Sequence, residues 1–179
     1  MKNIELKVKT KNFHRAINLL KKLGATRRKP LFQVDTYFHS PVGRLKTREI
    51  NRSSQELIYY QRPDSRKSKV STYKIIPLSP AELKITKNIL GRLYKKWLVV
   101  KKNRDLWRFK HTRIHLDNVQ NLGNFIELET VANEIDIRSA RREHKAIVRE
   151  LQLLQFKKIS HSYSDLLAAR SNLGKKTII

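Results

Sequence analysis

Charged and apolar side chains alternate along the segment NIELKVKT near the start of the chain. If this segment is a strand, Glu5, Lys7 and Lys9 share one face, because successive side chains of a strand point to opposite sides. Carboxylates bind hard divalent cations such as Mg²⁺, and Lys and Arg side chains bind phosphate oxygens. The face is therefore either a solvated surface or part of a site for an anion and a metal ion.

The same alternation recurs in later segments that are typical of strands. The charged positions on these faces are Arg44, Lys46, Arg48, Lys74, Lys102, Arg104, Arg113, His115, Asp117, Glu127 and Glu129. In a single strand of this kind, the charged face is usually exposed to solvent. Recurrence in both halves of the chain favours instead a closed sheet with the charged residues inside, a polar lumen whose like charges a polyphosphate and a metal ion would neutralise.

The net charge of the chain indicates an anionic partner. Forty Lys and Arg stand against fifteen Asp and Glu in 179 residues, a formal charge of +25. Such an excess is typical of proteins that bind nucleotides, polyphosphates, nucleic acids or acidic membranes, although a basic protein from a Lys-rich proteome would also show it. The length fits one domain with a proper core.

Absent residues and segments exclude several classes. There is no cysteine, which excludes a disulfide scaffold and thiolate metal sites. No signal-peptide core and no apolar run of membrane-spanning length is visible, so we expect a soluble, cytoplasmic protein with no membrane partner. Among six histidines only His111 and His115 have a zinc-like spacing, and such a pair in a strand is more often structural.

Periodicity and turn signals predict an α+β fold. Helices are expected within 12–24, capped by Asn12, within 79–93, and within 134–156, where Ala140, Ile147, Leu151 and Leu154 form the apolar stripe; a short helix at 162–170 precedes a basic tail at 172–179. Strands are expected within 32–50 on both sides of the turn SPVG, and at 56–63, 71–77, 97–109, 112–119 and 124–131, with a basic loop at 64–69.

About eight short strands without a βαβ rhythm predict an antiparallel, roughly eight-stranded β-tunnel, a closed barrel with helices packed on the outside. We interpret 1–179 as a single domain, with a front half at 1–77, a connecting helix at 79–93 and a back half at 94–179.

Several blocks in order resemble the CYTH superfamily, the triphosphate tunnel metalloenzymes. These blocks are IELKVK, FQVDTYFHSPVGRLKTRE, VVKKNRDLW, RIHLDNVQNLGNFIELET and SYSDLL, spread over essentially the whole chain. QVDTYF and LGNFIELE look most like the class IV adenylyl cyclase branch; thiamine triphosphatases are also members. The resemblance implies a single CYTH-like domain folded as a tunnel open at both ends.

The resemblance also implies roles for individual residues and a Mg²⁺ or Mn²⁺ cofactor. Glu5, Glu127 and Glu129 match its metal-binding carboxylates, and Lys9 and Asp117 match catalytic positions. The basic residues that would hold the triphosphate are Lys9, Lys46, Arg48, Lys74, Lys102 and Arg104.

The chain departs from the family's opening motif, E-x-E-x-K, at one position. Lys7 stands where the second glutamate is expected, which changes the charge beside a divalent cation by two units. At short range this repulsion is worth several kcal/mol. Either the metal shifts onto Glu127 and Glu129, or its affinity falls, or the site no longer uses metal in the family's way. The extra positive charge would instead favour binding of the phosphate chain.

Two functions are therefore open. The first is an enzyme that acts on a nucleoside triphosphate or another polyphosphate with a divalent metal: a cyclase forming cyclic AMP and pyrophosphate from ATP, or a triphosphate hydrolase. The second is a metal-impaired tunnel protein that binds polyphosphate, nucleotide or RNA without catalysis. Lys7, the net charge and the basic runs at 27–29, 66–69, 94–96 and 157–158 favour the second, but no RNA-binding motif is evident.

Overall fold

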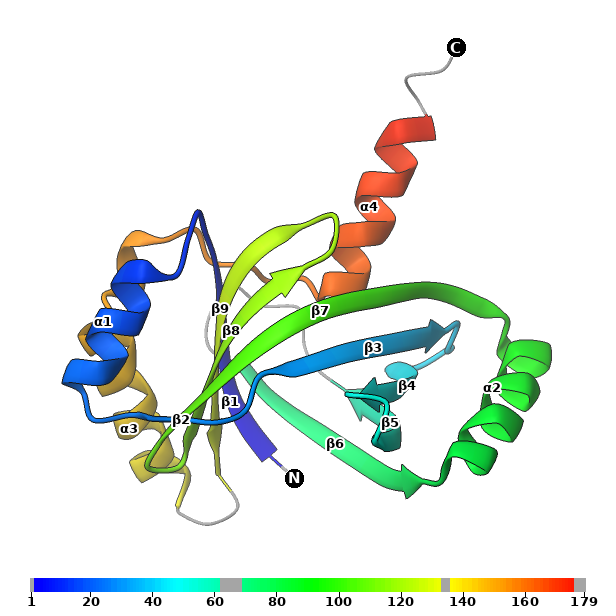
Figure 1. Ribbon diagram of the computed structural model, residues 1–179, viewed down its shortest axis with the longest axis horizontal. Helices are drawn as coiled ribbons and strands as arrows, with labels where there is room; N and C mark the ends of the chain where they lie inside the picture. Colours follow the sequence, from blue (N-terminus) through cyan, green and yellow to red (C-terminus); the bar gives the residue numbers. More distant parts are fainter. Residues whose placement is uncertain (1, 62–68, 133–135, 176–179) are drawn as a thin grey trace.

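A computed structural model describes residues 2–61, 69–132 and 136–175 (Figure 1). Most of the predicted basic loop at 64–69 lies outside these ranges. The described strands are β1 (Lys2–Thr10), β2 (Thr26–Arg27), β3 (Leu31–Phe38), β4 (Arg44–Ile50), β5 (Ser54–Gln61), β6 (Lys69–Leu78), β7 (Lys96–Phe109), β8 (Thr112–Val119) and β9 (Gly123–Val131). The described helices are α1 (His14–Lys22), α2 (Pro80–Tyr94), α3 (Ile137–Glu150), the 3₁₀ turn η1 (Leu153–Gln155) and α4 (Tyr163–Lys175).

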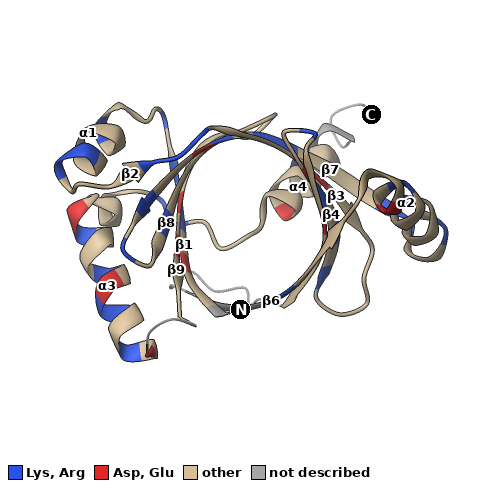
Figure 2. Cartoon of the chain, turned by 60° about the horizontal axis from the view of Figure 1, so that its bottom comes forward, with Lys and Arg blue, Asp and Glu red and all other residues tan. Residues whose placement is uncertain are grey.

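Eight of these strands form a closed antiparallel ring. Their order is β7-β3-β4-β5-β6-β1-β9-β8, and β8 pairs back to β7. Figure 2 looks through this ring. The short β2, which the sequence did not predict, pairs with the far end of β7. The α+β barrel with helices outside is thus confirmed.

Two meanders and the strand β1 make up the ring. The strands β3 to β6 form one meander and β7 to β9 the other, each joined by successive pairing. β3 pairs with β7, while β1 lies between β6 and β9. The ring therefore uses strands from both the front and the back of the chain.

The apolar faces of three strands point outward, against helices. Leu6 and Val8 of β1 are buried together with apolar residues of β8 and β9, α1 and α3 in one core cluster. Figure 1 shows α1 and α3 on this side of the barrel and α2 on the other. Burial of the apolar residues on the outer face leaves the alternate, polar positions to line the interior.

The helix caps follow the sequence closely. In α2, Ser79 Oγ accepts a hydrogen bond from the Glu82 amide at 3.2 Å, and Glu82 Oε2 accepts one from the Ser79 amide at 2.7 Å, which confirms the capping box. In α1 the capping position is Phe13, one residue later than expected, although Asn12 Oδ1 still accepts a hydrogen bond from the His14 amide at 3.3 Å.

The predicted helix at 134–156 is shorter in the structure. It begins at Ile137 and ends at Glu150, and Gln152 adopts a left-handed conformation with φ 52° before η1. This turn shifts the register, so that Leu153 is buried and Leu154 is 62% exposed. The prediction that Leu154 continues the apolar stripe is wrong. At the other end of the chain, α4 runs on to Lys175, into the segment expected to be a tail.

A second core cluster fills one end of the barrel. Tyr37, Val100, Val119 and Phe125 lie at inward positions of their strands and pack with Tyr163, the first residue of α4. The start of α4 therefore packs against this cluster. None of the described helices is long and apolar enough to cross a bilayer.

Candidate functional site

The barrel encloses a cavity of about 260 Å³ lined mainly by charged and aromatic side chains. All eight strands of the ring contribute to its wall. Its charged lining residues are Lys7, Lys46, Arg48, Lys102, Arg104, Arg113, Glu5, Asp35, Glu56, Glu127 and Glu129. Six cations therefore face five carboxylates, so the lumen is close to electrically balanced.

Asp35 of β3 holds two cations of β4 in place. Its carboxylate contacts Lys46 Nζ at 2.7 Å and Arg48 Nε at 2.8 Å, and all three residues are mostly buried. Burial opposes ionisation of Asp35, but Arg48 and Lys46 hold its pKa well below the usual range. The carboxylate fixes the positions of the two cations while further N–H groups of Arg48 stay available to a ligand.

Asp117 of β8 does the same for Arg104 of β7. Arg104 donates from Nε and Nη2 to the two Asp117 oxygens, both at 2.7 Å, and from Nη2 to Glu127 Oε2 at 3.1 Å. The Tyr163 hydroxyl donates to Asp117 at 2.9 Å. Burial raises the pKa of Asp117, but Arg104 and Lys102 outweigh it and lower the pKa to about 2.

Lys102 lies beside Arg104 with less compensation. Its Nζ is 3.9 Å from Asp117 and 5.3 Å from the centre of the Tyr163 ring. Burial, and then the neighbouring Arg104, lower the pKa of Lys102 to about 7. An anion that entered the cavity would favour the charged form of this lysine.

Lys7 of β1 stands directly opposite Glu127 of β9 in the sheet. Its Nζ is 3.4 Å from Glu127 Oε1, donates to the His161 carbonyl at 3.3 Å, and lies 4.1 Å from the centre of the Tyr163 ring. Burial opposes the ionisation of Glu127, but Lys7 is the main cause that holds the pKa of Glu127 well below its usual range. The residue that departs from the family motif is thus a buried ion-pair partner of a predicted metal ligand.

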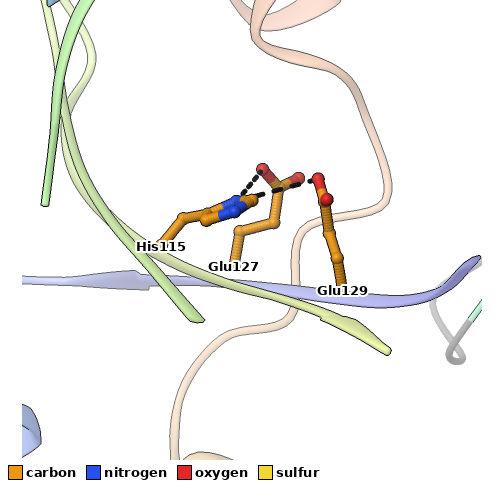
Figure 3. A group of neighbouring side chains, drawn as sticks. All are labelled: His115, Glu127 and Glu129. Carbon is orange, nitrogen blue, oxygen red and sulfur yellow. Dashed lines mark ion pairs between the residues drawn. The ribbon is translucent and has the colours of Figure 1, made fainter. Parts of the chain in front are cut away.

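One group in the described chain has the composition of a metal site: His115, Glu127 and Glu129. Each offers a ligand atom, and the three atoms lie within 4.8 Å of one another. Figure 3 shows the imidazole pointing toward the two carboxylates. Burial and Arg104 lower the pKa of His115, which favours the neutral, metal-binding form of the ring near neutral pH.

Most of the predicted site residues line the cavity. Those that do are Glu5, Lys7, Lys46, Arg48, Lys102, Arg104, Glu127 and Glu129. Asp117 is fully buried behind Arg104. Glu5 faces Glu129 across the β1–β9 pair, but Tyr73 donates a hydrogen bond to it, and it is not part of the His115 group.

The structure does not bring Lys9 or Lys74 to the cavity. Lys9 is exposed near the end of β1, where its Nζ lies 5.7 Å from the centre of the Phe125 ring. Lys74 is exposed on the outer face of β6, because its neighbours Tyr73 and Ile75 take the inward positions. The segment TYKII contains a single charged residue, so no alternation of charged and apolar positions predicted the side on which Lys74 lies.

Several residues of the site were missed or undervalued, among them Glu56, which lines the cavity. Asp35, Tyr73 and Tyr163 were not predicted to take part, and the side on which Asp35 lies follows from its alternation with Val34 and Thr36. His115 was placed on a charged strand face, and as a metal ligand it was weighed only with His111. In the structure, His111 instead contacts Glu143 of α3, with Nδ1 3.0 Å from Oε2.

A closed antiparallel barrel with a charged lumen and helices outside defines the class of this protein. The CYTH domain model matches residues 1–163, and the chain belongs to this family. No curated protein matches the chain.

Solved structures share the fold at low sequence identity. The PH1012 protein from Pyrococcus horikoshii is 23% identical, with a TM-score of 0.78, over 92% of this chain and 98% of that one. An adenylate cyclase candidate from Vibrio parahaemolyticus is 18% identical, with a TM-score of 0.70, over 93% and 97%. An adenylyl cyclase candidate from Hippeastrum, described as having a dominant triphosphatase activity, is 13% identical, with a TM-score of 0.63, over 96% and 95%.

Proposed function

We propose that this protein binds a triphosphate in the barrel cavity and cleaves one of its phosphoanhydride bonds with the help of a divalent metal ion. The observation that carries the proposal is the placement of four basic side chains, Lys46, Arg48, Lys102 and Arg104, in one cavity with the His115, Glu127 and Glu129 group. Triphosphate chains need both kinds of group, since their oxygens bind Lys and Arg and share divalent cations with carboxylates.

The cations would act by binding and orienting the phosphates. Asp35 and Asp117 hold Arg48 and Arg104 in place through paired hydrogen bonds, so little reorganisation is needed when charge develops on the transferred phosphoryl group. Burial of the lumen strengthens these interactions relative to water.

The residues present also fit a metal ion. The His115 Nδ1 atom is buried and has no hydrogen-bond partner within the described chain, and it lies beside two carboxylates. Bound there, a divalent ion would neutralise charge on the phosphate oxygens. Mg²⁺ and Mn²⁺ are both candidates for this ion.

The reaction class depends on the nucleophile. Attack by the 3′-hydroxyl of ATP on the α-phosphate would give cyclic AMP and pyrophosphate, and attack by water on the γ-phosphate would give inorganic phosphate. The similarity to one cyclase candidate, and to another described with a dominant triphosphatase activity, supports testing both.

The test is to incubate the full chain with ATP, other nucleoside triphosphates, thiamine triphosphate and tripolyphosphate, with Mg²⁺ or Mn²⁺. Cyclic nucleotide, pyrophosphate and phosphate are measured. We expect metal-dependent turnover of at least one substrate, with a loss of about 100-fold or more in Arg104→Met. The exposed Lys74→Met is the matched control, and we expect it to be unchanged. No turnover of any substrate would overturn the enzymatic proposal.

A second candidate function is triphosphate or polyanion binding without catalysis. The contact of Lys7 with Glu127 favours it, because a lysine already partly neutralises a carboxylate expected to bind metal. Tripolyphosphate binding that is unaffected by a chelator, in a protein with no turnover, would support this second function. RNA binding measured over a range of salt concentrations would extend the test to larger polyanions.

A further inference from the structure

The Nδ1 atom of His115 is a buried atom of the metal cluster that makes no hydrogen bond of normal length within the described residues. Its side chain is 3% exposed, and its Nδ1 atom is buried and unpartnered. A buried polar nitrogen without a partner is costly, so such an atom calls for a ligand. Nδ1 lies 3.8 Å from Glu127 Oε2 and 3.7 Å from Glu129 Oε1, beyond hydrogen-bonding distance of both.

These separations fit a shared metal ion. Two atoms that bind one ion at about 2.1 Å lie about 3.0 Å apart at a right angle and at most about 4.2 Å apart when they face each other across it. Both distances from His115 fall between these limits. A normal hydrogen bond would bring the atoms closer, and Figure 3 shows the ring pointing toward both carboxylates.

The backbone fixes this arrangement. His115 and Glu127 are direct partners in the β8–β9 pair, and Glu129 follows Glu127 on the same face of β9. The other carboxylate oxygens are already engaged: Lys7 contacts Glu127 Oε1 and Arg113 contacts Glu129 Oε2 at 2.9 Å. These contacts orient the carboxylates so that Glu127 Oε2 and Glu129 Oε1 face the His115 ring. Arg104 also contacts Glu127 Oε2.

We infer that His115, Glu127 and Glu129 bind one first-row transition ion of the Mn²⁺ type in preference to Mg²⁺. The inference deepens the proposed function, because it adds a nitrogen ligand and names the class of metal. The positive charges of Lys7 and Arg104 repel Mg²⁺ and Mn²⁺ about equally, because the two ions have the same charge. Imidazole nitrogen adds affinity for transition ions, whereas Mg²⁺ prefers oxygen ligands. The bond to His115 would therefore compensate this repulsion for the transition ion but not for Mg²⁺.

The direct test uses the unmodified full chain and Mn²⁺ alone. Pulsed electron paramagnetic resonance detects the coupling of a ¹⁴N nucleus to bound Mn²⁺, and titration calorimetry gives the affinities for Mn²⁺ and Mg²⁺. We expect a nitrogen coupling, and Mn²⁺ binding at least about tenfold tighter than Mg²⁺ binding. Bound Mn²⁺ without nitrogen coupling would overturn the inference, as would equal affinities for the two ions.

Variants give a second, independent readout. His115→Gln should weaken Mn²⁺ binding by about tenfold or more. His115→Asp, which replaces nitrogen by oxygen, should retain binding and lose the preference for Mn²⁺. The control is His111→Gln, which removes a histidine outside the cavity that contacts Glu143. Unchanged Mn²⁺ affinity in a folded His115→Gln would contradict the inference.

These measurements stand apart from turnover. Nitrogen-ligated Mn²⁺ in a protein that cleaves no triphosphate would uphold the metal site and reject the proposed reaction. Turnover of a triphosphate without a nitrogen-ligated metal would uphold the proposed reaction and reject the metal site.

Discussion

A single residue, Lys7, decides how the carboxylates of this barrel can be used. It lies opposite Glu127 in the sheet, and Glu5 lies opposite Glu129, so the β1–β9 pair holds one ion pair and one pair of like charges. The family motif would have placed a carboxylate at position 7 as well. Here the ammonium partly neutralises the acidic cluster from within the protein, which lowers the demand for a bound cation.

Restoring the acid should therefore strengthen metal binding. We expect Lys7→Glu to raise the affinity for Mg²⁺ about tenfold or more, because a positive charge next to Glu127 becomes a negative one. Calorimetry with Mg²⁺ measures this, and Lys9→Glu, two residues along the same strand but exposed, is the control for a general charge effect. Equal Mg²⁺ affinities in the two variants would argue against a metal near Lys7.

The pKa of Lys102 gives a pH-dependent stability. Burial and Arg104 lower it from 10.5 to about 7, so between these values the unfolded chain holds a proton that the folded protein does not. The contribution of Lys102 to the free energy of unfolding therefore rises with pH across this window, by about 2 kcal/mol from pH 7 to 9.

Denaturant unfolding at pH 7 and pH 9 tests this contribution. Lys102→Met should lose the rise relative to the unmodified protein, whereas Lys74→Met on the outer face of β6 should keep it. An identical pH dependence in the unmodified protein and Lys102→Met would show that Lys102 keeps an ordinary pKa in the fold.

Many residues of the site could be predicted from the alternation of charged and apolar positions alone. Glu127 and Glu129, or Lys46 and Arg48, occupy alternate positions of a strand, so each pair had to share a face. The partners of these residues could not be predicted in the same way. Tyr163 reaches Asp117 across 46 positions of the chain, and Lys7 meets Glu127 only because β1 pairs with β9. Such contacts follow from how the ring closes, which the local pattern does not contain.

Among the elements, α3 shows where local periodicity fails. Its predicted stripe is followed as far as Leu151, and the left-handed Gln152 then moves the buried position from Leu154 to Leu153. The helix ends six residues before the predicted end at 156, and the spacing of its leucines does not indicate this. Most of the strands and the capping box of α2 were predictable, because turn residues and capping side chains act locally.

This register change predicts opposite outcomes for two neighbouring leucines. Leu153→Ala should lower the free energy of unfolding by about 2–5 kcal/mol, since Leu153 is fully buried in the core cluster that also contains residues of β1, β8 and β9. Leu154→Ala is the matched control and should change it by less than about 0.5 kcal/mol. Chemical denaturation of both variants measures the difference, and comparable losses would mean that the helix continues through position 152.

For the whole molecule, the excess of positive charge lies mostly outside the cavity. The described lining carries six cations and five carboxylates, whereas the chain has forty Lys and Arg and fifteen Asp and Glu. The net charge of +25 therefore describes the rest of the protein far more than the lumen, and it does not by itself identify the ligand of the cavity.

Surface repulsion of this size should make stability depend on salt. We expect the melting temperature to rise by several degrees between about 10 mM and about 150 mM NaCl, because screening weakens the mutual repulsion of the surface cations. Differential scanning calorimetry without phosphate or metal ions measures this. A constant or falling melting temperature would show that repulsion between surface cations is not a major destabilising factor.

The pairing of β3 with β7 joins the two meanders along one side of the ring, and Gln33 and Leu31 pair there with Lys102 and Arg104. These two cations therefore sit on the seam itself, while Lys46 and Arg48 belong to the other meander. A phosphate chain held by both sets would act as a cross-link between the meanders. Local opening of the barrel would then be slowest when the cavity is occupied. The amide hydrogens of β3 and β7 would therefore exchange more slowly in the presence of the ligand.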